Sequence, residues 1–497
     1  METTGTGKKE AGFSLLIFSI SLAMFMGSLD GTIVNIALPA ISESFHISTT
    51  TVSWVSTAYL LVMAGCVLVF GKISDIIGFK KIFLAGFAIF TLGSLSCAVL
   101  PDLTGSFLTL IGSRIFQAIG GAMITAIAPA MITVYIPMEQ KGKAMGIVMT
   151  FAALGTALGP TIGGVLTQYL TWHWIFLINV PVGIVAVLLG AKVIPAMAGH
   201  GTMTGFDRAG AGLIFVGLAS LLYVVSEGES AGWTSPAIVL LALVAVVTLG
   251  WFVRHELSTE DPLMDLRLFK NKNFLLANLL LCLVFFSFAG ISYLLPFYLK
   301  YVRNYGTSDA GLILTSLSFA MMGAGILAGM LINRTGPRLL CIAAALPLTA
   351  GYYLMTRLHP DTHAGFVVVS LILIGFGLGL MITPLSNMIM NSVARTKQGM
   401  ISSLTSLERF APLTLGIATF NLIFLQGVLM IAKNHDVTES SPAEIQIQVL
   451  SAGFDFAFLL SFVLGLVIVV LALVTQEEVH PDYLNQPAGD EPMTGMI

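Results

Sequence analysis

The residues of this sequence most able to do chemistry are ionisable side chains inside otherwise apolar stretches. Four stand out: Asp30, Arg114, Glu408 and Arg409. A charged group at the centre of a membrane-spanning helix costs at least about 2.5 kcal/mol on insertion scales, so each must face the protein interior or a wet cavity. A carboxylate that gains and loses a proton is the simplest device for proton coupling, and Asp30 and Glu408 are candidates for it.

Each of these residues also has a plainer interpretation. Asp30 can be a structural carboxylate near the outer end of its helix, and Arg114 can be a structural arginine held by backbone carbonyls. Glu408 and Arg409 are adjacent, and neighbours on a helix point about 100° apart, so both cannot line one narrow seam. One of the two can face a central cavity while the other reaches the helix interface. A cavity-facing Glu408 would be a second proton or cation site, and the sequence leaves this choice open.

The composition excludes an ordinary soluble protein. Of 497 residues, 56% are hydrophobic and only 10% are charged, against roughly 25% charged residues in soluble domains. The net charge of −3 argues against nucleic acid as a partner. The four cysteines lie in apolar runs without metal-ligand spacing, and the histidines lie at or near predicted helix ends or in loops, so we expect no metal and no cofactor. The motifs HExxH and Walker A are absent, which argues against an enzyme or an ATP-driven pump.

The apolar stretches predict an all-α polytopic membrane protein. A span needs about 20 mostly apolar residues. By that measure the sequence contains fourteen spans, near residues 12–38, 50–71, 80–100, 105–134, 141–168, 171–194, 208–226, 235–254, 273–299, 308–331, 337–357, 364–390, 398–430 and 451–474. An even number of spans places both termini on the same side of the membrane.

The distribution of lysine and arginine tests this count. With the N-terminus inside, 17 of the 23 lysines and arginines fall in inward segments and four in outward segments, while Arg114 and Arg409 lie within spans. Cytoplasmic loops of membrane proteins carry such an excess of positive charge. The asymmetry supports fourteen spans and an orientation in the cell membrane with both termini in the cytoplasm.

A repeated turn divides the spans into two halves. The turn after the second span contains Gly71, Asp75, Gly78, Lys80 and Lys81. A related pattern recurs 258 residues later, from Gly329 to Arg338, with Asn333 where the first copy has its aspartate. Two glycines permit a tight turn between adjacent helices, and duplicated halves are typical of secondary transporters.

The halves and the charged connections give the predicted organisation of the chain. It consists of a cytoplasmic N-terminus (1–11), an N-terminal six-helix bundle (12–195), two linker helices (196–256), a cytoplasmic connection (257–272), a C-terminal six-helix bundle (273–475) and a cytoplasmic tail (476–497).

The fifth span carries a row of small residues. Gly155, Gly159 and Gly163 recur at intervals of four and form one smooth helix face, with Pro160 and Gly164 beside them. Small residues at this spacing let two membrane helices approach closely, and the proline can kink the helix. Generic close packing is the plainer interpretation of this pattern.

Taken together, these motifs resemble the major facilitator superfamily, and within it the fourteen-span drug:proton antiporter family. The turn from Gly71 to Lys81 is similar to the signature GxLaDrxGrkxxl, and the fifth-span glycines match the antiporter motif GxxxGPxxGG. The stretch Leu29–Pro39 is nearly identical to LDxTIVNVALP, and Arg114–Gly120 resembles RxxQGxG with Ala118 in place of the first glycine. The stretches beginning at Trp54 and Trp172 are matched as well.

The resemblance implies a fold and roles for individual residues. The fold would be two six-helix bundles with two additional central helices, fourteen in all. Asp30, Arg114 and Glu408 would couple proton occupancy to substrate binding, the fifth-span glycines would keep the closed transporter from leaking, and the repeated turn would act as a cytoplasmic gate. We expect the substrate cavity to contain Asn35, Trp54, Tyr59, Gln117 and Arg409.

The function expected from these features is proton-coupled antiport that exports drugs or other amphipathic or cationic small molecules by alternating access. The alternative is export of a physiological metabolite, lipid or siderophore by the same mechanism. The expected partners are a small-molecule substrate, protons and the lipid bilayer, with the chain working as a monomer.

Overall fold

The described part of the chain is built of helices. A computed structural model describes residues 3–136, 138–195, 207–228, 231–259, 262–393, 398–434 and 442–478. The longer helices are α1 (Thr3–Phe45), α3 (Trp54–Ile77), α4 (Phe79–Thr104), α5 (Phe107–Tyr135), α6 (Met138–Tyr169), α8 (Asn179–Val193), α9 (Arg208–Glu227), α10 (Pro236–Ser258), α11 (Lys272–Phe297), α12 (Thr307–Thr335), α13 (Pro337–Met355), α14 (Ala364–Asn391), α15 (Gln398–Asn434) and α16 (Ala443–Val474). Short helices are α2 (Thr49–Val52), α7 (Trp174–Leu177), η2 (Leu266–Lys270) and η3 (Tyr298–Val302).

Fourteen segments in the described residues are long and apolar enough to cross a membrane. Each coincides with one of the fourteen predicted spans, so the predicted fold class is confirmed. Helices form here because lipid offers no hydrogen bonds, and a helix satisfies its backbone groups internally. Several boundaries differ from the prediction, two of them near the site. Helix α1 continues through Pro39 to Phe45, and the predicted sixth span is divided at Ile178 between α7 and α8.

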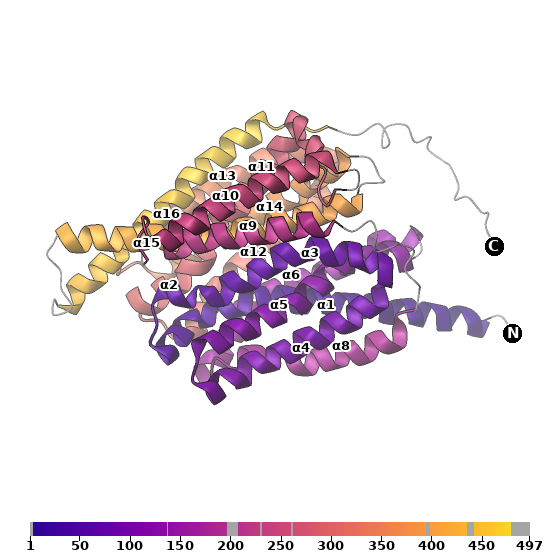
Figure 1. Ribbon diagram of the computed structural model, residues 1–497, viewed down its shortest axis with the longest axis horizontal. Coiled ribbons are helices and arrows are strands. Elements are labelled where there is room, and N and C mark those ends of the chain that lie inside the picture. The colour runs from indigo at the N-terminus through magenta and orange to yellow at the C-terminus, as the bar shows by residue number, and fades with distance from the viewer. Residues whose placement is uncertain are drawn as a thin grey trace.

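The helices gather into two groups (Figure 1). In the first, α1 packs on α6, and α5 packs on both α3 and α4. In the second, α12 and α13 pack on α14, and α11 packs on α15. The groups meet where α6 contacts α12, α3 contacts α15, and α1 contacts α11. Helix α9 contacts both α3 and α15, and α10 packs on α9. The pair α9–α10 therefore lies at the seam between the groups.

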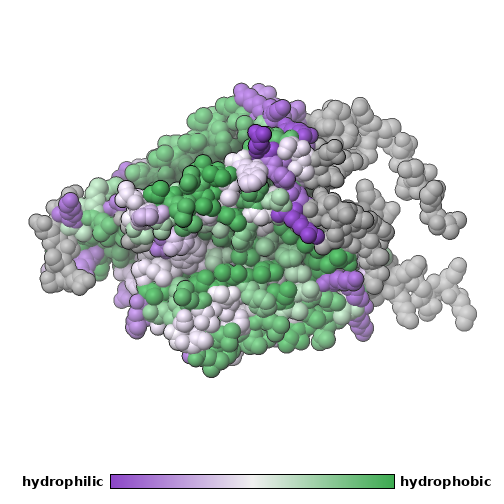
Figure 2. Space-filling view, viewed as in Figure 1, coloured by the Kyte–Doolittle hydropathy of each residue, from purple (hydrophilic) through white to green (hydrophobic). Residues whose placement is uncertain are grey.

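The outer surface of the helices is apolar along their length. Figure 2 shows hydrophobic residues over the flanks and hydrophilic residues gathered toward the two ends of the molecule. Large apolar side chains point outward, including Leu108, Leu188 and Val246. A soluble monomer rarely exposes continuous apolar surface of this kind. The flanks are suited to contact with lipid.

Three glycines determine how closely α1 and α6 approach. A Cβ atom at Gly155 would collide with the backbone oxygen of Phe25, and one at Gly159 with the hydroxyl of Thr32. At Gly163 it would lie 2.8 Å from the backbone oxygen of Ile33. Since the backbone of α1 cannot yield as a flexible side chain does, these positions require glycine. The close approach fixes the position of α1, which carries Asp30.

Replacement of Gly155 by alanine should destabilise the protein, because the added methyl group meets main-chain atoms of α1. We expect a loss of about 1–3 kcal/mol in the free energy of unfolding, as for other overpacked sites. Thermal unfolding of the purified protein measures this. Gly112→Ala is the matched control, since a Cβ there meets nothing within 4 Å. Equal melting temperatures for the two variants would contradict the packing argument.

Candidate functional site

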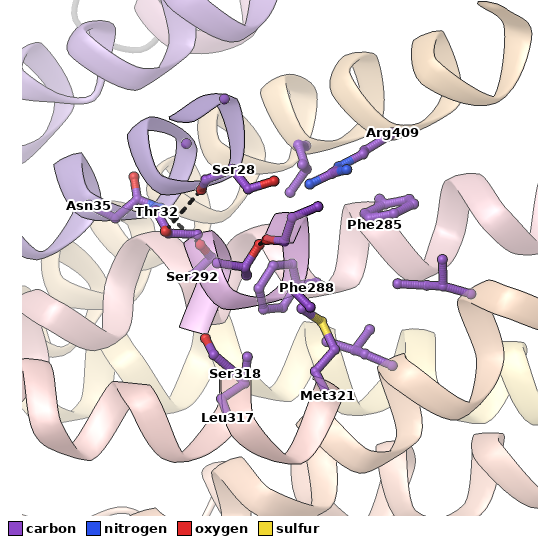
Figure 3. A pocket seen from close by; sticks show the side chains of 18 of the residues that line it. Ser28, Thr32, Asn35, Phe285, Phe288, Ser292, Leu317, Ser318, Met321 and Arg409 are labelled. Atoms are coloured by element: carbon purple, nitrogen blue, oxygen red, sulfur yellow. Dashed lines mark hydrogen bonds between the residues drawn. The ribbon is translucent and has the colours of Figure 1, made fainter. Parts of the chain in front are cut away.

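A cavity of about 760 Å³ lies between the two groups of helices. Its walls come from α1, α3, α5 and α6 on one side and from α11, α12, α14 and α15 on the other. Most lining side chains are apolar, and the polar ones are mainly hydroxyls and amides (Figure 3). In the described lining, the charged side chains are Arg114 and Arg409, and no carboxylate is present.

The cavity is closed at one end by contacts between the two groups. Three side-chain hydrogen bonds cross the seam: Asn35 Nδ2 donates to Ser292 Oγ at 2.9 Å, Asn421 Nδ2 to Thr50 Oγ1 at 2.9 Å, and the hydroxyls of Thr161 and Thr315 lie 2.5 Å apart. The backbone N–H of Ser308 also donates to Gln168 Oε1 at 2.7 Å, and the Tyr293 hydroxyl donates to the backbone oxygen of Thr49.

The closed end lies opposite the end at which α1 begins and α16 ends. Lining residues continue from mid-membrane toward that terminal end, as far as Thr150 on α6, Gly329 on α12 and Thr383 on α14. In the described residues, the hydrogen bonds between the two groups gather on the other side of the cavity. The structure is therefore a state closed at one face of the membrane.

Behind the cavity wall lies a buried ion pair. Arg114 Nη1 is 2.9 Å from Asp30 Oδ2, and the two side chains are 1% and 0% exposed. The second carboxylate oxygen, Oδ1, accepts hydrogen bonds at 3.0 Å from Gln117 Nε2 and from Asn179 Nδ2. A buried charge is tolerated only when it is paired and hydrogen-bonded. Three donors from two helices meet this requirement for Asp30.

Arg114 connects the carboxylate to the cavity. Its Nη1 also donates to Gln117 Oε1 at 2.6 Å, and its Nε donates to the backbone oxygen of Val55 at 3.2 Å. The guanidinium carbon lies 4.0 Å from the centroid of the Tyr59 ring, within the range of a cation–π contact. Arg114 and Tyr59 line the cavity, whereas Asp30 does not. A change in the charge of Asp30 can thus reach the cavity through these two wall residues.

On α15, the structure shows which of Glu408 and Arg409 faces the cavity, the choice that the sequence leaves open. Arg409 lines the cavity, and its guanidinium carbon lies 5.9 Å from the centroid of Phe285. Glu408 is only 6% exposed, does not line the cavity, and its Oε2 has no hydrogen-bond partner in the described structure. The rotation of about 100° between neighbouring residues turns one toward the cavity and the other into the helix packing.

Two residues predicted for the cavity lie elsewhere. Gln117 is drawn behind the wall by its hydrogen bonds to Asp30 and to Ser94 Oγ, the latter at 2.7 Å. Trp54 stands at the start of α3 and faces α9, where its Nε1 donates to Glu227 Oε1 at 2.9 Å. Both corrections have the same cause, because a better polar partner lies away from the cavity. Asn35, Tyr59 and Arg409 do line it.

The predicted gating turns have matching backbones. Gly78, between α3 and α4, has φ +94°, and Gly336, between α12 and α13, has φ +78°. Both values lie where residues with a side chain are strained, which explains glycine in both copies. Lys80 Nζ donates to the backbone oxygen of Ala191 at 2.8 Å. The side chains of Asp75 and Asn333 lie outside the described residues.

Sequence reasoning missed the part that Asn179 has in the site. It begins α8 and donates to Asp30 across 149 positions of chain. A fully buried asparagine in an apolar span is costly without a hydrogen-bond partner. Its presence in the sequence therefore indicated a buried polar partner. Its partner could not be identified, because several spans offer acceptors.

Comparisons with known proteins are consistent with this geometry. The family model described as Major Facilitator Superfamily matches residues 20–201 and 194–416. The chain is 33% identical over 414 residues to the riboflavin transporter RibZ of Clostridioides difficile, covering 83% of this chain and 89% of that protein. It is 31% identical over 438 residues to the multidrug resistance protein Stp of Mycobacterium tuberculosis (strain CDC 1551 / Oshkosh), covering 88% and 80%.

A solved structure agrees in fold. The bacterial homologue of the human lysosomal transporter Spinster, in an inward-facing and occupied conformation, superposes with a TM-score of 0.62. The two chains are 16% identical, and the match covers 93% of this chain and 96% of the other.

A double-mutant cycle should reveal the coupling between Asp30 and Arg114. Asp30→Leu leaves an uncompensated buried guanidinium, so we expect a loss of about 3–5 kcal/mol in the free energy of unfolding. Arg114→Met should also destabilise, and the double variant should be more stable than the sum of the single effects predicts. Thermal unfolding of the four purified proteins gives these values. Additive effects would show that the two charges do not interact.

Proposed function

The chain belongs to the Major Facilitator Superfamily, and we propose that it exports amphipathic small molecules across the cell membrane in exchange for protons. It is a multi-pass membrane transporter with fourteen apolar helices and not an enzyme. In this proposal both termini lie in the cytoplasm, and the closed end of the cavity faces outward. The chain works as a monomer, with residues 12–195 and 273–475 as the two moving bundles.

The observation that carries the proton-coupling proposal is the Asp30–Arg114 pair directly behind the cavity wall. A proton on Asp30 removes the negative charge that holds Arg114 and Gln117. Charge-assisted hydrogen bonds are roughly twice as strong as neutral ones, so protonation loosens the contacts of both donors. Because Arg114 lines the cavity together with Tyr59, the shape of the wall depends on proton occupancy.

Exchange of substrate for protons follows if the substrate binds only while Asp30 holds the wall residue Arg114 in place. In the state closed to the outside, deprotonated Asp30 holds Arg114 in place and the substrate binds. After the bundles rock and the seam contacts such as Asn35–Ser292 break, the substrate leaves and a proton enters from outside. The protonated site disorders the wall, so proton and substrate exclude each other without sharing a group. Glu408 is a second buried carboxylate that can take up a proton on α15.

Support for export comes from the relatives. The protein Stp is named for multidrug resistance, and the Bacillus subtilis protein MdtP, which is 30% identical over 439 residues, is named as a multidrug transporter. The fifth-span glycines support exchange, since they hold α6 tightly against α1 and, at Gly164, leave no room for a Cβ beside the backbone oxygen of Thr307 on α12.

Asp30→Asn should abolish export driven by a proton gradient, because asparagine cannot take up the proton. In proteoliposomes with an imposed pH difference, we expect transport to fall to the level of empty vesicles. Substrate binding without a gradient should also weaken, because neutral asparagine resembles protonated Asp30, which in this mechanism leaves the wall disordered. Gradient-driven export at the wild-type rate in this variant would remove Asp30 from the coupling mechanism.

Asp30→Glu serves as the control for that measurement. It keeps a titratable carboxyl group and should retain partial gradient-driven transport. A melting temperature of Asp30→Asn far below that of Asp30→Glu would identify a folding defect instead of a coupling defect.

A second candidate function is export of a physiological metabolite by the same mechanism, and the similarity to the riboflavin transporter RibZ favours it. A lipid or a siderophore is the other form of this alternative. If it holds, riboflavin added to the vesicles should compete with the exported molecule. Absence of competition by riboflavin, with efficient export of unrelated amphiphiles, would favour the drug exporter.

A further inference from the structure

Arg409 is the group of the cavity whose charge the protein leaves uncompensated. The side chain is exposed within the cavity, and in the described structure no hydrogen bond or ion pair reaches its guanidinium. Its contacts are ring faces, at 5.9 Å from the centroid of Phe285 and 5.7 Å from that of Phe410. Arginine cannot lose its proton in a protein. A permanent positive charge with unused donors thus faces the cavity.

The neighbouring charges do not balance it. Arg114 already pairs with Asp30, which is hidden behind the wall. Glu408, the neighbour of Arg409 in sequence, turns into the helix packing and does not line the cavity. The described lining contains no carboxylate. A cation entering this space would meet the positive charge of Arg409 and would find no carboxylate in the described lining to pair with.

The rest of the cavity suits an aromatic body. Apolar side chains line the cavity together with Arg409, among them Phe285, Phe288, Leu317, Met321, Phe410 and Leu413. Methionine and phenylalanine adapt well to planar ligands through sulfur–aromatic and ring contacts. Small polar groups, including Ser28, Thr32 and Asn35, line the wall formed by α1 (Figure 3). A planar molecule between these surfaces can direct a polar end to Arg409.

We infer that the cavity takes aromatic amphiphiles whose polar end is a hydrogen-bond acceptor, neutral or anionic, that Arg409 binds this end, and that cations are rejected. This inference rests on the proposed function and replaces the cationic substrates expected from the sequence. The planar fork of arginine suits a carboxylate or a carbonyl group.

The test uses three probes with the same pyrene body and different ends, on purified protein without any gradient. The probes are pyrenebutyrate, pyrenebutyramide and pyrenylmethyltrimethylammonium. In the wild type, the carboxylate and the amide should bind more tightly than the ammonium. Arg409→Gln should weaken carboxylate binding by about 10–100-fold, the equivalent of one charge-assisted hydrogen bond, while ammonium binding stays unchanged or improves.

Three further variants serve as controls for this result. Gly31→Phe projects into the cavity from a position where a Cβ meets nothing within 4 Å, so it should fill the space and weaken carboxylate binding. Arg357→Gln removes a cation that lies outside the cavity lining and should leave binding unchanged. Arg409→Lys keeps the charge without the fork and should bind the carboxylate with intermediate affinity.

Several outcomes would overturn the inference. One is ammonium binding as tight as carboxylate binding in the wild type. Another is an equal loss for all three probes in Arg409→Gln, or an equal loss of carboxylate binding in Arg357→Gln. Carboxylate binding at wild-type strength in Gly31→Phe would place the anion outside the cavity and would also contradict the inference.

Charge movement separates this inference from the proposed exchange. One proton entering for one exported cation moves no net charge, whereas exchange for a neutral or an anionic molecule moves positive charge inward. Export of the amide should therefore speed up when the vesicle potential favours inward positive charge. Failure of gradient-driven export, with the expected probe binding intact, would refute the exchange alone. Gradient-driven export without the expected preference among the probes would refute the substrate class alone.

Discussion

The buried ion pair between Asp30 and Arg114 is the interaction on which the rest of the site depends. Two charges removed from water at mid-membrane are tolerable only with nearly complete hydrogen bonding. Donors from α5 and α8 therefore converge on a carboxylate of α1, and the backbone oxygen of Val55 on α3 accepts from Nε of the arginine. Four helices of one bundle are held in register by one pair of charges.

The glycine face of α6 is the second constraint, because it places the helix that carries Asp30. A neighbouring face of α6 reaches the other bundle: Gly164 contacts the backbone at Thr307, and Gly311 on α12 leaves no room for a Cβ beside the backbone oxygen of Pro160. The small residues of one helix thus fix both the position of the carboxylate and the approach of the bundles at the closed end. Since packed interfaces are bistable instead of continuously deformable, such a contact suits a two-state transporter.

Much of the fold follows from the sequence because lipid imposes one dominant rule. Each apolar run of about 20 residues must become a helix, so all fourteen spans could be predicted. The candidate site was less accessible. Asp30 and Arg114 were identifiable because their charges are costly in lipid, but a helix rotation of about 100° decides whether Glu408 or Arg409 meets the cavity. Gln117 and Trp54 were misassigned because their partners, Ser94 and Glu227, come from other helices. Such pairings depend on three-dimensional packing.

The placement of charges also restricts how protons and substrate can influence each other. A shared carboxylate in the cavity would let a cation displace a proton directly, but the described lining holds none. Asp30 lies behind the wall, so in the proposed mechanism its proton acts on the substrate through Arg114 and the face of Tyr59. Glu408 and Arg409 on the other bundle differ from this pair, because the carboxylate is buried in the helix packing while the arginine faces the cavity. In the proposed mechanism, coupling therefore depends on how firmly Asp30 holds Arg114, and it can operate on substrates that carry no positive charge.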